Sequence, residues 1–208
     1  FAKAYTLAAK LHNRDANLVL AKTVEEMCVG ELWQISTKYN FAMDEEQYLK
    51  VIYHKTGSLF ATACRLGGVD SDAPAAQVEA LAHYGACFGT AFQIVDDCLD
   101  LTGDEREMGK SLGTDLEKGK LTLPLIKLLR DLPPAARKDL QEVLSSRNGE
   151  DRKGAVLRLV REHDVLAYSL RRAADFIDDA KASLRQLPDS PHVDCLLNLA
   201  DFVIDRRI

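Results

Sequence analysis

The chain has 208 residues, of which 47% are hydrophobic and 28% charged, and its formal net charge is −5. This length suffices for one globular domain with its own core, and an acidic chain offers no global basic surface for nucleic acid. No apolar run reaches the roughly 18 residues of a membrane-spanning helix, and no signal-peptide pattern is visible, so we expect a cytoplasmic protein.

The cysteine pattern also predicts a cytoplasmic protein. The five cysteines form an odd set without a C-x-x-C pair, and each lies in an apolar helical pattern, which indicates reduced core residues. They are Cys28, Cys64, Cys87, Cys98 and Cys195. The five histidines are scattered without ligand spacing, which argues against a zinc site.

The first third of the chain is predicted to be helical. Its first twelve residues read as the middle of a helix, because Phe1 follows neither an initiator Met nor an N-cap, and we expect the chain to begin partway through a longer protein. A second helix is predicted from Asp15 to about Tyr39. A third begins at Asp44, where Gln47 completes a capping box, and is expected to end before Gly67–Gly68.

The most apolar helix begins at Pro74 and is expected to reach Thr102. It is apolar nearly all round, which is typical of a helix at the centre of a fold. The segment from Gly103 to Lys120 holds four glycines and mixed charges, which predicts a loop rather than a helix. Further helices are expected near residues 122–131, 134–145, 151–163, 165–186 and 191–206. The pattern predicts a single all-α domain over residues 1–208.

Three aspartates interrupt the central helix. Asp96 and Asp100 are one turn apart on the same face, and Asp97 lies on the adjoining edge. Like charges at this spacing repel, and the flanking residues are apolar, so we expect no cation within reach to offset them. A hard divalent cation such as Mg²⁺ would neutralise the cluster. The alternative is an acidic helix rim exposed to water.

A second acidic set provides a comparison within the chain. Asp175, Asp178 and Asp179 also share a helical face, but arginines at 171 and 172 accompany them. We interpret this set as a solvated, ion-paired surface. The contrast favours the metal interpretation for the first cluster.

Basic and polar residues could complement the metal cluster by binding an anion. Lys110 and Lys120 lie among glycines, a composition that suits a phosphate site, although a flexible solvated loop has the same composition. Lys55 and Thr56 interrupt an apolar helical run and could reach an anion, but a snorkelling lysine is the commoner case. Gln93 could hydrogen-bond a ligand oxygen or a buried carbonyl.

Four segments together give the chain a resemblance to the trans-isoprenyl (polyprenyl) diphosphate synthases. They are Gly30–Gln34, Lys55–Leu59, Phe92–Asp100 and Gly109–Lys120, in the order of the family. The resemblance covers essentially the whole chain. It implies the isoprenoid synthase fold: an all-α, antiparallel helix bundle around a central cavity for the prenyl chain, here without its N-terminal helices.

The resemblance also implies roles for individual residues. Asp96, Asp97 and Asp100 match the second of two aspartate-rich motifs, which together bind three Mg²⁺ ions around the allylic diphosphate. The implied diphosphate ligands are Lys55, Lys110 and Lys120, and the implied catalytic residues are Lys55, Thr56 and Gln93. The family joins an allylic prenyl diphosphate to isopentenyl diphosphate, and its members are mostly homodimers.

The chain departs from the family in one respect. No D-D-x-x-D motif stands before residue 96, so the first aspartate-rich motif is absent from the sequence. We therefore expect a fragment of a prenyltransferase that is inactive alone. Two alternatives stay open: a non-catalytic subunit of a heteromeric synthase, and a class I terpene cyclase with the same fold.

Overall fold

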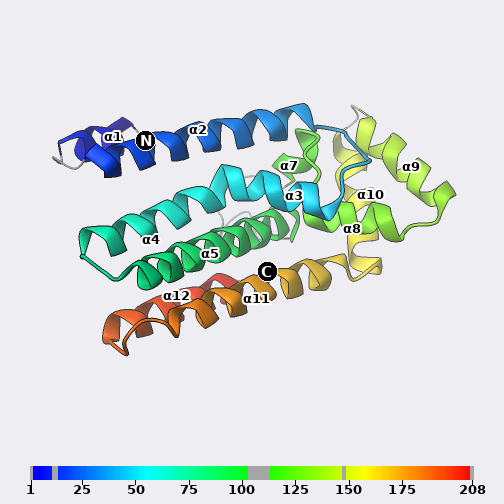
Figure 1. Cartoon of the computed structure of the whole chain (residues 1–208). Helices are drawn as coiled ribbons and strands as arrows, with labels where there is room; N and C mark the ends of the chain where they lie inside the picture. The colour runs from blue at the N-terminus through cyan, green and yellow to red at the C-terminus, as the bar shows by residue number, and fades with distance from the viewer. Residues whose placement is uncertain (1, 11–13, 103–112, 147–148, 207–208) are drawn as a thin grey trace.

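The computed structural model describes residues 2–10, 14–102, 113–146 and 149–206. Within these ranges every regular element is a helix, which confirms the all-α prediction (Figure 1). None of the described helices combines the length and the apolar character that crossing a membrane requires.

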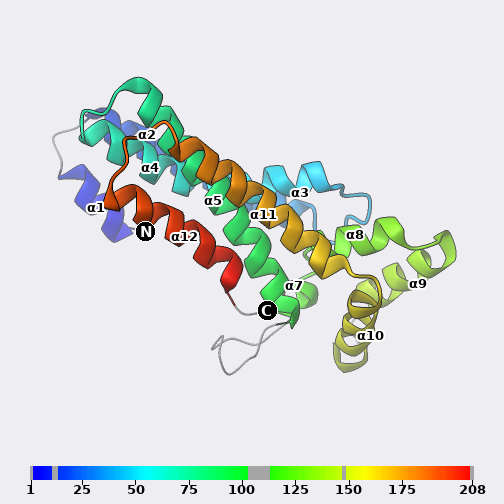
Figure 2. The ribbon, with the colours of Figure 1, turned by 90° about the horizontal axis from the view of Figure 1, so that it is seen from below.

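Helix α5 (Ala75–Thr102) is the centre of the bundle. It packs between α4 (Ser58–Asp70) and α11 (Val165–Leu184), which run antiparallel to it on opposite sides (Figures 1 and 2). Most of its last two turns are buried, which agrees with its predicted apolar circumference. The acidic cluster therefore lies on the most enclosed helix of the fold.

The N-terminal third of the chain lies on the α4 side of α5. Helix α1 (Ala2–Ala9) precedes the long α2 (Arg14–Ser36), and α3 (Glu45–Ile52) leads into a π-helical turn, η1 (Tyr53–Gly57). Asp44 and Gln47 form the predicted capping box at the start of α3. Helix α2 packs on η1 and α4, and so covers the turn that carries Lys55 and Thr56.

The prediction of one helix from Asp44 to the glycine pair is wrong in two respects. The π-helical turn divides it, and such turns are frequent at functional sites. The second part, α4, also continues through Gly67–Gly68 to Asp70. Packing on α5 accounts for the continuation, because a β-carbon on Gly68 would lie 3.0 Å from Leu81 Cδ1. Glycine at this position permits the close approach of α4 to α5, although a glycine costs roughly 1 kcal/mol inside a helix.

The remaining helices gather at the C-terminal end of α5 and beneath it (Figure 1). They are α7 (Thr114–Glu117), α8 (Leu123–Asp131), α9 (Pro134–Ser145), α10 (Gly149–Glu162) and α12 (Pro191–Asp205). The prediction of a loop up to Lys120 is wrong at α7, where one helical turn forms. The end of α12 returns to the C-terminal end of α5 (Figure 2).

The cysteines divide between core and surface. Cys87 and Cys98 are buried, and burial raises their thiol pKa to about 11 and about 12, respectively. Cys64 is half-buried, but Cys28 and Cys195 are exposed, so the core prediction is wrong for these two. Cys28 lies on α2, which carries several exposed apolar side chains. On this helix an apolar sequence pattern therefore does not identify the core.

Candidate functional site

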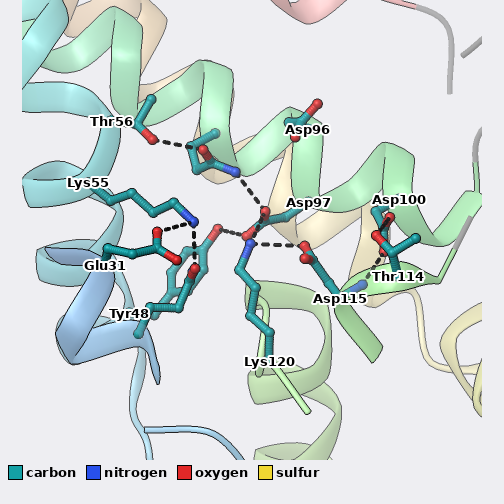
Figure 3. A network of polar contacts seen from close by, with 12 residues as sticks. Glu31, Tyr48, Lys55, Thr56, Asp96, Asp97, Asp100, Thr114, Asp115 and Lys120 are labelled. Carbon is teal, nitrogen blue, oxygen red and sulfur yellow. Dashed lines mark hydrogen bonds and ion pairs between the residues drawn. The ribbon is translucent and has the colours of Figure 1, made fainter. Parts of the chain in front are cut away.

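Asp97 is the centre of a buried polar network near the end of α5 (Figure 3). Its side chain is fully enclosed, with 0% exposure. Oδ1 accepts hydrogen bonds from Gln93 Nε2 at 2.8 Å and from Lys120 Nζ at 2.7 Å, and Oδ2 accepts one from the Tyr48 hydroxyl at 2.8 Å. Three donors therefore satisfy a carboxylate that would otherwise be costly to bury.

Lys120 bridges two carboxylates. Its ammonium group lies 2.7 Å from Asp97 and 2.9 Å from Asp115, and its side chain is only 10% exposed. The residue before it, Gly119, has a φ of +72°, and a β-carbon there would lie 2.3 Å from the Tyr39 ring. Only glycine fits this turn, which leads the chain from α7 to the lysine.

The charges of the network depend on one another. Burial has the largest effect on Asp97 and raises its pKa; Asp115 adds to the rise, whereas Lys120 and Gln93 oppose it. Burial alone would lower the pKa of Lys120, but Asp97 and Asp115 together raise it, so the ammonium group stays charged. Burial and the Asp97 charge raise the pKa of Tyr48 well above its usual value, so the phenol is a neutral donor.

The other two aspartates of the cluster have separate partners. Asp100 is 2% exposed and accepts hydrogen bonds from the Thr114 hydroxyl at 3.0 Å and from the Asp115 backbone N–H at 3.1 Å. Asp96 lies in a different direction (Figure 3), with its side chain 32% exposed and its Oδ1 3.7 Å from Nη2 of Arg206. The three carboxylates thus face three environments.

Two findings bear on the predicted metal cluster. The prediction that no cation is within reach is wrong, because Lys120 and Arg206 approach from segments distant in sequence. In the described part of the chain, no three His, Cys, Asp or Glu side chains lie close enough to share a metal ion. Metal binding by Asp96, Asp97 and Asp100 stays a prediction.

The two predicted residues of η1 lie in different contacts. The Thr56 hydroxyl donates to Gln93 Oε1 at 2.8 Å, which extends the Asp97 network to the π-helical turn. Lys55 instead contacts α2, with its Nζ 2.8 Å from Glu31 Oε2 and 2.6 Å from Gln34 Oε1. Figure 3 shows the two groups side by side. Lys110 lies outside the described residues.

An apolar groove begins beside Lys55. It has a volume of about 320 Å³ and is lined by Val24, Met27, Cys28, Glu31 and Lys55. Glu31 and Lys55 are its charged lining residues, and the other three are apolar. This arrangement suits a ligand with a charged head and an apolar tail.

The comparison set on α11 is a solvated surface, as predicted. Asp175, Asp178 and Asp179 are all exposed, and Asp175 pairs with Arg172 at 2.8 Å. The same arginine also contacts Glu45 on α3. These acids are therefore offset by a cation of their own helix and by water.

Sequence reasoning missed three residues of the site. Tyr48 has the spacing of a core residue of α3, and nothing in the sequence shows that its hydroxyl meets Asp97 across 49 positions. Asp115 lies in the glycine-rich segment, but its pairing with Lys120 depends on the turn at Gly119. Arg206 stands at the far end of the chain, and no local pattern connects it with Asp96.

Comparisons with known proteins identify the family of the chain. The model of the polyprenyl synthetase family matches residues 1–160. Octaprenyl diphosphate synthase of Escherichia coli (strain K12) is 31% identical over 206 residues, which are 99% of this chain and 64% of that protein. Nonaprenyl diphosphate synthase of Mycobacterium tuberculosis is 35% identical over 207 residues, 99% of this chain and 61% of that protein.

Solved structures give the same result. Polyprenyl synthase from Caulobacter crescentus CB15, complexed with calcium and isoprenyl diphosphate, matches with a TM-score of 0.94 and 32% identity over 100% of this chain and 64% of that one. Decaprenyl diphosphate synthase from Rhodobacter capsulatus matches with a TM-score of 0.90 and 36% identity over 99% of this chain and 64% of that one. The chain thus spans less than two thirds of these proteins. In sequence and in its isoprenoid synthase fold, the chain belongs to the polyprenyl synthetase family.

Proposed function

We propose that the chain forms part of the active site of a prenyltransferase that joins an allylic prenyl diphosphate to isopentenyl diphosphate. The observation that carries the proposal is the Thr56–Gln93–Asp97–Lys120 network, which holds polar and charged groups in fixed positions inside an apolar bundle. The named relatives, which are prenyl diphosphate synthases, support the same reaction class.

We propose that the diphosphate binds between Lys55 and Lys120. Lys55 is partly exposed at the groove, where it can contact an anion. Lys120 uses two of its three N–H donors on Asp97 and Asp115, which leaves one for a phosphate oxygen. Lys110 is proposed as a third ligand from the family resemblance. We propose that Thr56 and Gln93, which are joined by a hydrogen bond, orient the reacting end of the allylic substrate.

The donor chemistry of the site fits Mg²⁺, which prefers carboxylate and phosphate oxygens. Of the three predicted ligands, Asp96 has the carboxylate that a ligand can reach, because its side chain is 32% exposed, whereas Asp97 and Asp100 are buried. We propose Asp96 as the direct ligand, with Asp97 and Asp100 adding negative charge behind it. When bound, Mg²⁺ would neutralise the departing diphosphate. Three ions would require a second aspartate-rich motif, which this sequence lacks.

The chain's own residues favour the proposed reaction in two ways. The fixed positive charges of Lys55 and Lys120 stabilise negative charge as it develops on the leaving diphosphate. The apolar wall of Val24 and Met27 excludes water from the allylic cation, so that the double bond of isopentenyl diphosphate can attack it. This attack forms the new carbon–carbon bond and moves the positive charge to the isopentenyl unit, which then loses a proton to the released diphosphate and gains a double bond.

The metal proposal predicts a loss of ligand affinity in Asp96→Asn. We expect its affinity for a non-hydrolysable prenyl diphosphate analogue in the presence of Mg²⁺ to fall about tenfold or more, because a neutral amide binds the cation poorly. Isothermal titration calorimetry measures the change. The matched control is Asp178→Asn, which removes one charge from the exposed acidic set and should bind as the wild type does. Equal affinities of Asp96→Asn and wild type would contradict the metal role.

We also propose that the protein is a homodimer that pairs through α2. Four large apolar side chains of this helix are exposed, with fractions of 50–67%: Leu18, Val29, Leu32 and Ile35. An apolar face of this kind on a helix is typical of a protein–protein contact. The family resemblance supports a second copy as the partner.

The dimer proposal predicts that Leu32→Glu is monomeric, because the substitution places a charge at the centre of the apolar face. Sedimentation velocity measures the mass. Phe202, on α12, is 62% exposed, so Phe202→Glu adds the same charge away from α2 and should leave the dimer intact. A monomeric wild type, or a dimeric Leu32→Glu, would exclude pairing through this face.

A further inference from the structure

The adjacent acids Asp96 and Asp97 are held by cations in different ways. The Lys120–Asp97 pair is 2.7 Å long, and its two side chains are 10% and 0% exposed. The Arg206–Asp96 pair is 3.7 Å long, and its two side chains are 23% and 32% exposed. The first distance is that of a charge-assisted hydrogen bond, whereas the second is too long for one. Lys120 therefore holds Asp97 firmly, whereas the contact between Arg206 and Asp96 is loose.

Arg206 is held in place by weak contacts. Its guanidinium group lies 4.7 Å from the centre of the Phe92 ring, a cation–π distance. Its Nη1 atom is enclosed, yet it donates to no acceptor among the described residues. A buried N–H without an acceptor is unfavourable, so the guanidinium group is not at its best position for hydrogen bonding.

The backbone conformation at Arg206 also allows its side chain to move. Helix α12 ends at Asp205, and Arg206 has φ −56° and ψ 124°, outside the helical region. Its side chain can therefore move away from Asp96 without unwinding a helical turn. Lys120 differs because α7 and the turn at Gly119 fix its backbone.

We propose that Arg206 is an exchangeable counter-ion of Asp96, which competes with a divalent cation for this carboxylate. The inference rests on the proposed metal role of Asp96. One positive group replaces another, so Asp96 is neutralised throughout the exchange and repulsion within the acidic cluster stays low. Arg206 therefore sets the affinity of the site for the metal, although it is not a ligand.

The test is a titration with Mn²⁺, a paramagnetic substitute for Mg²⁺, in which electron paramagnetic resonance measures the free ion. Arg206→Gln removes the competing charge and is expected to tighten Mn²⁺ binding by about threefold or more. Arg206→Lys retains the charge and should stay close to wild type. The difference between Arg206→Gln and wild type should shrink at high salt, because a partly exposed pair is screened.

Arg65→Gln is the matched control. Arg65 pairs with Glu79 through two hydrogen bonds, between α4 and the start of α5, so this variant has the same net charge as Arg206→Gln. Its Mn²⁺ affinity should equal that of wild type. If it also binds more tightly, the effect is one of overall charge, and the inference fails. Circular dichroism of each variant verifies that it is folded.

Asp96→Asn separates the inference from the proposed function. Weaker Mn²⁺ binding in this variant, together with equal affinities of Arg206→Gln and wild type, would support the metal site and overturn the counter-ion role. If neither wild type nor Arg206→Gln binds Mn²⁺ saturably, both proposals fail. If Arg206→Gln binds Mn²⁺ more tightly than wild type, and the addition of Asp96→Asn abolishes this binding, the result supports both the metal site and the counter-ion role.

Discussion

Replacing Lys120 by methionine is expected to lower the free energy of unfolding by about 3–5 kcal/mol. The substitution leaves the fully buried carboxylate of Asp97 without its cation, and Asp115, 2.9 Å from where the ammonium group stood, loses the same partner. Tyr48 and Gln93 still donate to Asp97, but neutral donors replace only part of a lost charge. The net effect is an uncompensated buried charge.

Urea unfolding followed by circular dichroism measures this change. Lys118→Met is the matched control, because Lys118 is an exposed lysine two positions earlier and makes no ion pair among the described residues. We expect its free energy of unfolding to change by less than about 0.5 kcal/mol. A Lys120→Met variant as stable as this control would show that the buried pair contributes nothing to the fold.

The pH dependence of Lys120→Met provides a second readout. The pKa of Asp97 is already raised by burial, and removal of the lysine raises it further, above the value in the unfolded chain. Between these two pKa values the folded variant binds a proton that the unfolded chain does not, so its stability increases as the pH falls. We therefore expect the difference from wild type to shrink on acidification from neutral pH, which urea titrations at several pH values measure.

The sequence could predict the elements of this fold because their signals are local. Pro74, the Asp44–Gln47 capping box and the apolar circumference of α5 depend on residues within a few turns of one another. The errors arose where tertiary contacts decide. Gly68 continues a helix because it packs on Leu81, and the π-helical turn has no local pattern that distinguishes it from an ordinary helix.

The sequence identified the charge cluster but not the arrangement of the groups around it. The spacing of Asp96, Asp97 and Asp100 identified an unusual charge cluster, yet their counter-charges come from Lys120 and Arg206. Such pairings depend on how distant segments fold back, and no periodicity encodes them. The same limit applies to Lys55 and Lys120, which were assigned to one diphosphate site and lie in two separate networks. A shared ligand between them stays a proposal.

The contact between α2 and η1 predicts a second large effect, in Gly30→Ala. A β-carbon at Gly30 would lie 2.6 Å from the backbone nitrogen of Lys55 and 2.9 Å from the carbonyl carbon of His54. Backbone atoms cannot rotate away as a side chain does, so the two helices must separate. We expect a loss of about 2–3 kcal/mol in the free energy of unfolding, at the upper end of overpacking effects.

Separation of α2 from η1 should also impair ligand binding, because η1 carries both Lys55 and Thr56. Lys55 reaches across this contact to Glu31 and Gln34, so its ammonium group would move with the turn. We expect a weaker affinity for the prenyl diphosphate analogue, measured by calorimetry below the unfolding transition. Gly67→Ala is the control: apart from its chain neighbours and the nearby backbone of its own helix, no atom lies within 4 Å of the position that the added methyl group would occupy, and helix propensity should stabilise this variant by about 0.5–1 kcal/mol. If Gly30→Ala retains both its stability and its affinity, the close approach of the two helices does not position Lys55 and Thr56.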